Sequence, residues 1–195
     1  MLQDFDIAGV RAINGLAGQY VWLDAVGIFG AHWLIYIMGA LVLAYVAVAW
    51  KTSHFEGRVE NLWHVCWTFV LAEITTYLIR FFWHRPRPFV TLDHITKLIN
   101  VPATEASWPS GHATAAFALA FGLFMHNRKW GYPMIALAVI VSLSRVYVGV
   151  HYPSDIIAGC VVAFFAAAIT APVKKRIEPY LDLFAVFRKY KRGAS

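Results

Sequence analysis

The chain has 195 residues, of which 59% are hydrophobic and only 14% are charged, and its mean hydropathy is +0.57. A soluble domain of this length needs far more charge to cover its surface, so the composition excludes an ordinary soluble protein and indicates an integral membrane protein. The net charge of +6 does not indicate nucleic-acid binding, because the basic residues lie between apolar segments rather than on one face.

The apolar segments predict an all-α bundle of about five transmembrane helices, which forms a single membrane domain over residues 1–195. Residues 1–30 combine helical apolar spacing with interrupting glycines, and this pattern predicts one or two short interfacial helices. Segments long enough to cross a bilayer follow, the third of them short, at 31–50, 62–83, 112–125, 132–150 and 156–173.

The remaining segments connect these spans or follow them. In the long 84–109 connection, four apolar residues recur at helical spacing and predict a short interfacial helix: Leu92, Ile95, Leu98 and Ile99. Basic residues gather in the turns at 51–60 and 127–129 and in an amphipathic tail at 174–195. Because cytoplasmic loops are enriched in lysine and arginine, the tail is predicted to be cytoplasmic. The opposite helix ends and the N-terminus are predicted to face outside.

The ionisable residues near the predicted spans are not scattered. Helices joined by short loops run antiparallel, so alternate helix ends share one side of the membrane. Six ionisable residues fall at ends that share the outer side: Arg80, Arg87, His112, Arg145, His151 and Asp155. Charges within a membrane protein usually serve a function, so this shared side is the predicted site.

The residue types predict chemistry on a phosphate group. Three converging arginines suit a tetrahedral oxyanion, because guanidinium groups pair with phosphate oxygens and stay charged. Ser110 and Gly111 precede a predicted helix and offer backbone N–H groups to an anion. His112 and His151 can divide the nucleophilic and acid–base roles, and Asp155, four residues after His151, can orient its ring.

Three motifs within residues 80–155 resemble the signature of the type-2 phosphatidic acid phosphatase family. The first, Lys-x6-Arg-Pro, lies at 80–88, the second, Pro-Ser-Gly-His, at 109–112, and the third, Ser-Arg-x5-His-x3-Asp, at 144–155. Arg80 replaces the lysine of the first motif, which keeps the charge but changes its reach and geometry.

The resemblance implies a metal-independent phosphohydrolase that needs no cofactor, housed in a helical membrane bundle. His151 would attack phosphorus, Asp155 would orient it, and His112 would protonate the leaving oxygen. The residues implied to bind the phosphoryl group are Arg80, Arg87, Ser110, Gly111 and Arg145.

Within the family, the small size of the chain and the runs at 85–89 and 108–117 are similar to bacterial undecaprenyl-diphosphatases of the bacitracin-resistance type. This likeness implies undecaprenyl diphosphate as substrate and a multi-pass location in the bacterial inner membrane, with the active site on the extracytoplasmic face. Phosphatidylglycerophosphate phosphatases share the same core, so phosphatidylglycerophosphate or phosphatidate is the alternative substrate. The expected partners are a membrane lipid and the bilayer, with no nucleic acid, and no oligomeric state is indicated.

Two other classes of protein were weighed. A metal-dependent hydrolase would use His112, His151 and Asp155 as ligands, but three arginines beside a divalent cation are electrostatically unfavourable. A lipid transporter is disfavoured because five predicted spans without an internal repeat do not match the usual inverted-repeat design.

Three polar residues near the predicted site have less defined roles. Glu73 is either a partner of a pocket arginine or a protonated carboxyl group hydrogen-bonded near Thr75 or Thr76. His32 is expected to hydrogen-bond within the bundle. Arg85 either holds the second phosphate of a diphosphate substrate or is a solvated interface residue.

Overall fold

A computed structural model describes the backbone of residues 1–51 and 56–193 and the side chains of residues 1–48 and 63–173. This described part is entirely helical outside its loops, as predicted. Its helices are α1 (Leu2–Asn14), α2 (Val21–His32), α3 (Leu34–Lys51), α4 (Glu56–Phe82), α5 (Pro88–Thr91), α6 (Gly111–Phe124), α7 (Arg128–Tyr147) and α8 (Pro153–Gly193).

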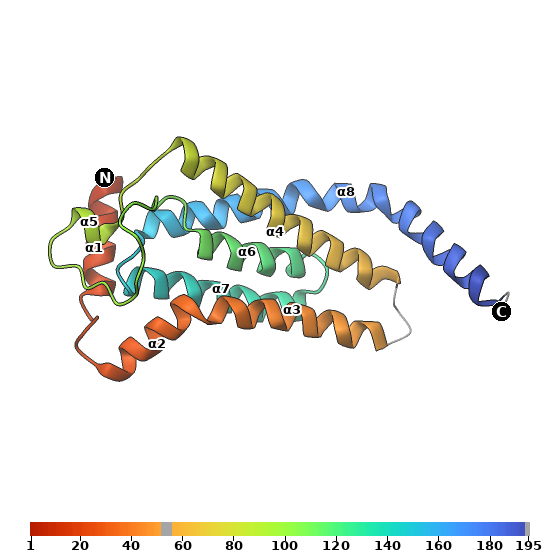
Figure 1. The fold of residues 1–195 in the computed structure, drawn as a ribbon, viewed down its shortest axis with the longest axis horizontal. Helices are drawn as coiled ribbons and strands as arrows, with labels where there is room; N and C mark the ends of the chain where they lie inside the picture. Colours follow the sequence, from red (N-terminus) through yellow and green to blue (C-terminus); the bar gives the residue numbers. More distant parts are fainter. Residues whose placement is uncertain (52–55, 194–195) are drawn as a thin grey trace.

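The long helices run lengthwise in one bundle, and the long connection between α4 and α6 lies at one end together with the turn between α7 and α8 (Figure 1). Helices α1 and α5 lie at this end, together with the chain between α4 and α6. Helix α8 extends beyond the bundle at the opposite end, toward the C-terminus. We call the end that holds α1 and α5 the shared end of the bundle. The three sequence motifs meet there.

Helix α6 is the centre of the bundle, since it packs against α3, α4, α7 and α8. Most of its fully buried positions are occupied by small residues, among them Ala113, Ala116 and Ala120. At Gly122 a Cβ atom would lie 3.0 Å from Cα of Val65, so α4 approaches the backbone of α6 closely. Small side chains allow this approach, which supports helix association in a membrane.

Three described helical segments are long and apolar enough to cross a membrane: Trp63–Phe82, Arg128–Tyr147 and Pro153–Val173. Val21–His32 and Leu34–Val48 qualify together as a pair bent by 51°, and α6 is a shorter apolar helix. By length and composition, the described part therefore contains three or four candidate spans.

The predicted first span differs from the structure at its beginning. A single helix over 31–50 was expected, but the helix breaks at Trp33 and the apolar stretch continues back through α2. The break follows from the packing of α2, because Gly27 and Gly30 lie directly against Tyr147 and Ser144 of α7. Helix α2 therefore crosses the end of α7 instead of continuing the axis of α3.

The predicted helix over 92–99 does not form, and α5 is the only helix described within the 84–109 connection. The side chain of Asn14 in α1 instead forms hydrogen bonds with backbone groups of this segment that would pair with one another in a helix. The N–H of Thr96 donates to Asn14 Oδ1 at 2.8 Å, and Asn14 Nδ2 donates to the carbonyls of Thr96 and Tyr147 at 2.8 and 2.7 Å. His94 also has a φ of 62°, which ends any regular helix.

The four apolar residues of that segment still pack, but in an extended loop. Leu98 and Ile99 join the apolar cluster around Tyr147, while Leu92 and Ile95 join the one around Val10 of α1. The spacing of these four residues therefore reflects burial of the loop against α1 and α7, and not the formation of a helix.

One further boundary differs from prediction, at the start of α7. The expected turn at 127–129 is the start of α7, because the Asn127 side chain accepts the N–H groups of Lys129 and Trp130. The predicted span at 156–173 corresponds to the apolar segment Pro153–Val173 of α8, and α8 continues through the predicted tail to Gly193. The side chains of the predicted basic turn at 51–60 and of the tail at 174–195 lie outside the described ones.

Gly149 provides a test of how the loop docks on the end of α7. Its φ is +80°, and an added Cβ would lie 2.6 Å from the carbonyl oxygen of Thr96. Gly149→Ala is expected to destabilise the protein by at least about 1 kcal/mol, because a left-handed backbone is unfavourable for alanine. The matched control is Gly39→Ala, since nothing lies within 4 Å of a Cβ at Gly39. Thermal unfolding in detergent measures both, and equal midpoints would contradict this account.

Candidate active site

The three motifs meet in a cleft of about 520 Å³ at the shared end of the bundle. Five of the eight predicted site residues line it: Arg80, Arg87, His112, Arg145 and His151. They come from the end of α4, the 84–109 connection, the start of α6, the end of α7 and the turn before α8. The antiparallel course of the helices thus brings together residues that are far apart in the sequence.

Arg87 is the most enclosed of the arginines, with 2% of its surface exposed. Its Nη1 donates to the carbonyl of Val150 at 3.1 Å and lies 3.4 Å from Nε2 of His151. Its Nη2 donates to the carboxylate of Glu105 at 3.1 Å. Burial lowers the pKa of Arg87, and Arg80 acts in the same direction, while Glu105 opposes both.

The other two arginines frame the cleft from α4 and α7. Arg80 donates from Nε and Nη2 to the carbonyl of Pro109 at 2.9 and 2.7 Å, which fixes the turn before α6. Arg145 is 4% exposed and donates from Nη1 to the carbonyl of Ala31 at 3.1 Å. Its Nε is buried and has no partner in the described part of the chain. An unpartnered guanidinium N–H beside the cleft is suited to donate a hydrogen bond to an oxyanion.

His151 and Asp155 form a fully buried pair. Nδ1 of His151 lies 3.3 Å from Oδ2 of Asp155, so the tautomer with hydrogen on Nδ1 leaves the lone pair of Nε2 beside Arg87. Burial lowers the pKa of His151 to about 3, although the hydrogen bond that the ring donates to Asp155 raises it and Arg145 lowers it further. The ring is therefore neutral at physiological pH, which is the state that a nucleophile requires.

The second motif supports the cleft in a different way from that predicted. Ser110 is fully buried, its side chain caps α6, and its N–H donates to the carbonyl of Asp155 at 3.1 Å. The expectation that this N–H is free for an anion is therefore wrong. Gly111 lies against the Arg80 guanidinium, because a Cβ there would be 3.6 Å from Nη1.

Among the residues that line the cleft but that the sequence did not assign to the site, four have polar side chains: His32, Tyr36, Asn100 and Glu105. His32 was expected to hydrogen-bond within the bundle, but it is exposed and lies at the break between α2 and α3. A histidine and a tyrosine four residues apart at the start of an apolar segment were the available signal. Glu105 had no comparable signal, because a single carboxylate in a long connection is ordinarily solvated.

Arg85 is an ion-paired residue in the structure, and its proposed contact with a second phosphate stays a prediction. It does not line the cleft, and it makes ion pairs with Asp6 at 2.6 Å and Asp155 at 2.8 Å. For Glu73, Oε1 is buried without a partner in the described part of the chain. The hydroxyls of Thr75 and Thr76 bond instead to the Leu71 carbonyl and to another hydroxyl, so neither satisfies Glu73.

Comparison with known proteins identifies the family. The sequence model of the PAP2 superfamily matches residues 61–178, which is more than half of the chain. Undecaprenyl-diphosphatase BcrC of Bacillus subtilis is 29% identical over 173 residues, or 89% of this chain and 86% of that protein. Bacitracin transport permease protein BcrC of Bacillus licheniformis is 31% identical over 184 residues, or 93% of this chain and 88% of that protein.

The fold is also found among solved structures. The crystal structure of a transmembrane PAP2 type phosphatidylglycerolphosphate phosphatase from Bacillus subtilis has a TM-score of 0.63 at 21% sequence identity. The match covers 90% of this chain and 87% of that one. Fold and cleft thus define an integral membrane protein with several helical spans.

The chain belongs to the PAP2 superfamily, and the resemblance found in its three motifs is confirmed. It is a membrane lipid phosphatase, a hydrolase that acts on lipid phosphoesters.

Proposed function

We propose that this protein hydrolyses undecaprenyl diphosphate to undecaprenyl phosphate, without a metal ion and through a phosphohistidine. The observation that carries the proposal is the cleft itself, where Nε2 of His151 lies beside Arg87 and Nδ1 faces Asp155. The choice of lipid is supported by the similarity to undecaprenyl-diphosphatase BcrC over most of both chains.

The chemistry has two steps. The terminal phosphoryl group binds to Arg80, Arg87 and Arg145, with Gly111 and Ser110 shaping the turn beneath it. The lone pair of His151 Nε2 forms a bond to phosphorus while the bond to the bridging oxygen breaks, and His112 gives a proton to the departing lipid phosphate.

Water completes the cycle. Its oxygen attacks the phosphohistidine, its proton passes to His112, and the phosphorus–nitrogen bond breaks to regenerate His151 and release phosphate. Asp155 keeps the ring oriented through both steps and stabilises the positive charge that the ring acquires. No described group of three His, Cys, Asp or Glu side chains is arranged to hold a metal ion.

We also propose five membrane crossings: the bent α2–α3 pair, α4, α6, α7 and α8. Helix α6 has 14 residues and spans about 21 Å, short of the roughly 30 Å of a bilayer core, so its start lies below the outer surface. The basic turns and tail then face the cytoplasm of the bacterial inner membrane, and the cleft faces the extracytoplasmic side.

His151→Ala is expected to abolish turnover while leaving detergent behaviour and helical content unchanged, because it removes the attacking nitrogen. Asp155→Asn should reduce turnover strongly but leave measurable activity, since Asp155 orients the nucleophile. Purified protein is assayed against prenyl diphosphates, phosphatidate and phosphatidylglycerophosphate, with and without chelator. Near-normal activity of His151→Ala would overturn the mechanism, and preference for a phospholipid phosphate would overturn the substrate. Activity lost to chelator and restored by zinc would establish the metal-dependent alternative.

His112→Ala is expected to slow cleavage of phosphate monoesters more than cleavage of diphosphates. The lipid phosphate released from a diphosphate is a better leaving group than an alkoxide, and general-acid assistance matters most for a poor leaving group. The measurement is kcat/KM on both substrate types for the intact protein and the variant. Equal losses would refute the leaving-group argument.

The proposed orientation is tested by single cysteines in a background carrying Cys66→Ser and Cys160→Ser. Asp93→Cys lies at an exposed position in the 84–109 connection, and Lys129→Cys lies at an exposed position at the opposite end. An impermeant thiol reagent on intact cells is expected to label the first and not the second. The reverse pattern would overturn the topology.

A further inference from the structure

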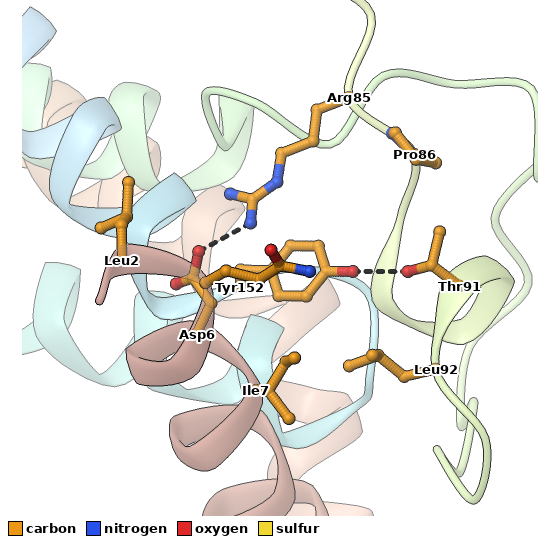
Figure 2. A pocket seen from close by; sticks show the side chains of 9 residues that line it. Leu2, Asp6, Ile7, Arg85, Pro86, Thr91, Leu92 and Tyr152 are labelled. Carbon is orange, nitrogen blue, oxygen red and sulfur yellow. Dashed lines mark hydrogen bonds and ion pairs between the residues drawn. The ribbon is translucent and has the colours of Figure 1, made fainter.

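Arg85 is held rigidly although it does not reach the cleft. Nη1 donates to Oδ1 of Asp155 and to the hydroxyl of Ser154, each at 2.8 Å, and Nη2 donates to Oδ2 of Asp6 at 2.6 Å. The guanidinium carbon also lies 3.9 Å from the centre of the Tyr152 ring. Figure 2 shows Arg85 reaching Asp6 on α1, with Tyr152 beside it. Its position is therefore fixed from three directions.

Asp6 joins α1 to the start of α8. It is 1% exposed, and besides Arg85 it accepts hydrogen bonds from the Ser154 N–H at 2.9 Å and the Ser154 hydroxyl at 2.6 Å. Removing a carboxylate from water is costly unless the charge is paired, so this one is paired on both oxygens. Helix α1 lies outside residues 61–178, which the family sequence model matches. The family core therefore does not account for Asp6.

The two oxygens of Asp155 are divided between two sets of partners. Oδ1 accepts from Arg85, whereas Oδ2 accepts from the Tyr152 N–H at 2.8 Å and from Ser107, and faces His151. A carboxylate rotates readily about its Cβ–Cγ bond unless both oxygens are held. Arg85 supplies the charged contact that holds the oxygen away from His151.

We propose that Asp6 and Arg85 are positioning residues for the nucleophile. Asp6 keeps the guanidinium on Oδ1 of Asp155, so that Oδ2 stays on Nδ1 of His151 and the lone pair of Nε2 points at phosphorus. This inference deepens the proposed function, since it takes His151 as the nucleophile. It makes α1 part of the catalytic apparatus although α1 contributes no residue to the cleft.

Lysine cannot replace Arg85 in this arrangement. The planar guanidinium presents separate N–H groups to two carboxylates while its face rests on a ring, whereas an ammonium is a compact point charge. Loss of the contact between Arg85 and Asp155 shifts the ring of His151 slightly. This shift slows the chemical step, because displacement of a reacting group by about 1 Å can cost about 100-fold in rate.

The test measures kcat and KM of Asp6→Asn and Arg85→Lys on whichever lipid phosphate the protein hydrolyses best. Asn at position 6 can still accept the Ser154 N–H but cannot form the ion pair with Arg85. Both variants are expected to lose kcat by about tenfold or more with KM changed less than about twofold, since positioning acts on the reacting atoms rather than on substrate binding. A rise in KM with unchanged kcat would overturn the proposal.

Two controls separate positioning from support of the fold. Asp4→Asn removes a carboxylate of α1 that is exposed and pairs only with the N-terminal amine among described groups, so it should leave kcat unchanged. Ser154→Ala removes the hydroxyl bonds to Asp6 and Arg85 but keeps both ion pairs, so it should lower kcat less than about twofold. A loss in Ser154→Ala equal to that in Asp6→Asn would assign the effect to the anchoring of α8 and overturn the proposal.

The decisive measurement is a double-mutant cycle with Asp155→Asn, which retains residual activity. If Asp6 acts through Asp155, the tenfold loss from Asp6→Asn should shrink to less than about twofold in the Asp155→Asn background. An undiminished loss would overturn the proposal, and Arg85→Lys gives the same test should Asp6→Asn fail to fold. Failure of the proposed function is read separately, from the substrate panel and from activity in His151→Ala.

Discussion

The structure depends on the burial of one carboxylate, that of Asp155. A charge fully removed from water must be paired and hydrogen-bonded, and the donors that do so here come from separate parts of the chain. Arg85 and Ser107 come from the connection between α4 and α6, and His151 from the turn before α8. The N–H of Ser110 bonds to the main-chain carbonyl of the same aspartate. The site forms at this end of the bundle because these donors must all reach Asp155.

Much of the bundle could be predicted from the sequence, because uninterrupted apolar segments have few alternatives in a membrane. The cores of α4, α6, α7 and α8 lie where the hydropathy places them. The break at Trp33 could not be predicted, since it arises from the contact of two glycines with α7, which is a tertiary effect. The missing helix over 92–99 has a similar cause, because the Asn14 side chain competes for the backbone of Thr96 across 82 residues of sequence.

The candidate site likewise combines features that the sequence predicts with contacts that it does not predict. Residue types and spacing were enough to place Arg80, Arg87, His112, Arg145 and His151 together, because their order along antiparallel helices fixes the side of the membrane. The partners of those residues were not predictable in the same way. Sequence separates Arg85 from Asp6 by 79 residues, and nothing in either segment signals the other. Contacts between side chains depend on how the helices dock, which no local pattern encodes.

The position of Glu105 has a consequence for how tightly the cleft can hold any anion. Its carboxylate already occupies Nη2 of Arg87, from a side chain that is 53% exposed. In the proposed reaction, a phosphoryl group that pairs with Arg87 displaces Glu105 from it, so the net affinity is a difference between two interactions. Under that proposal, competition from Glu105 weakens the binding of the inorganic phosphate product to Arg87. Glu105, in the 84–109 connection, is thus a counter-ion that Arg87 exchanges for phosphate. This exchange favours rapid turnover over tight product binding.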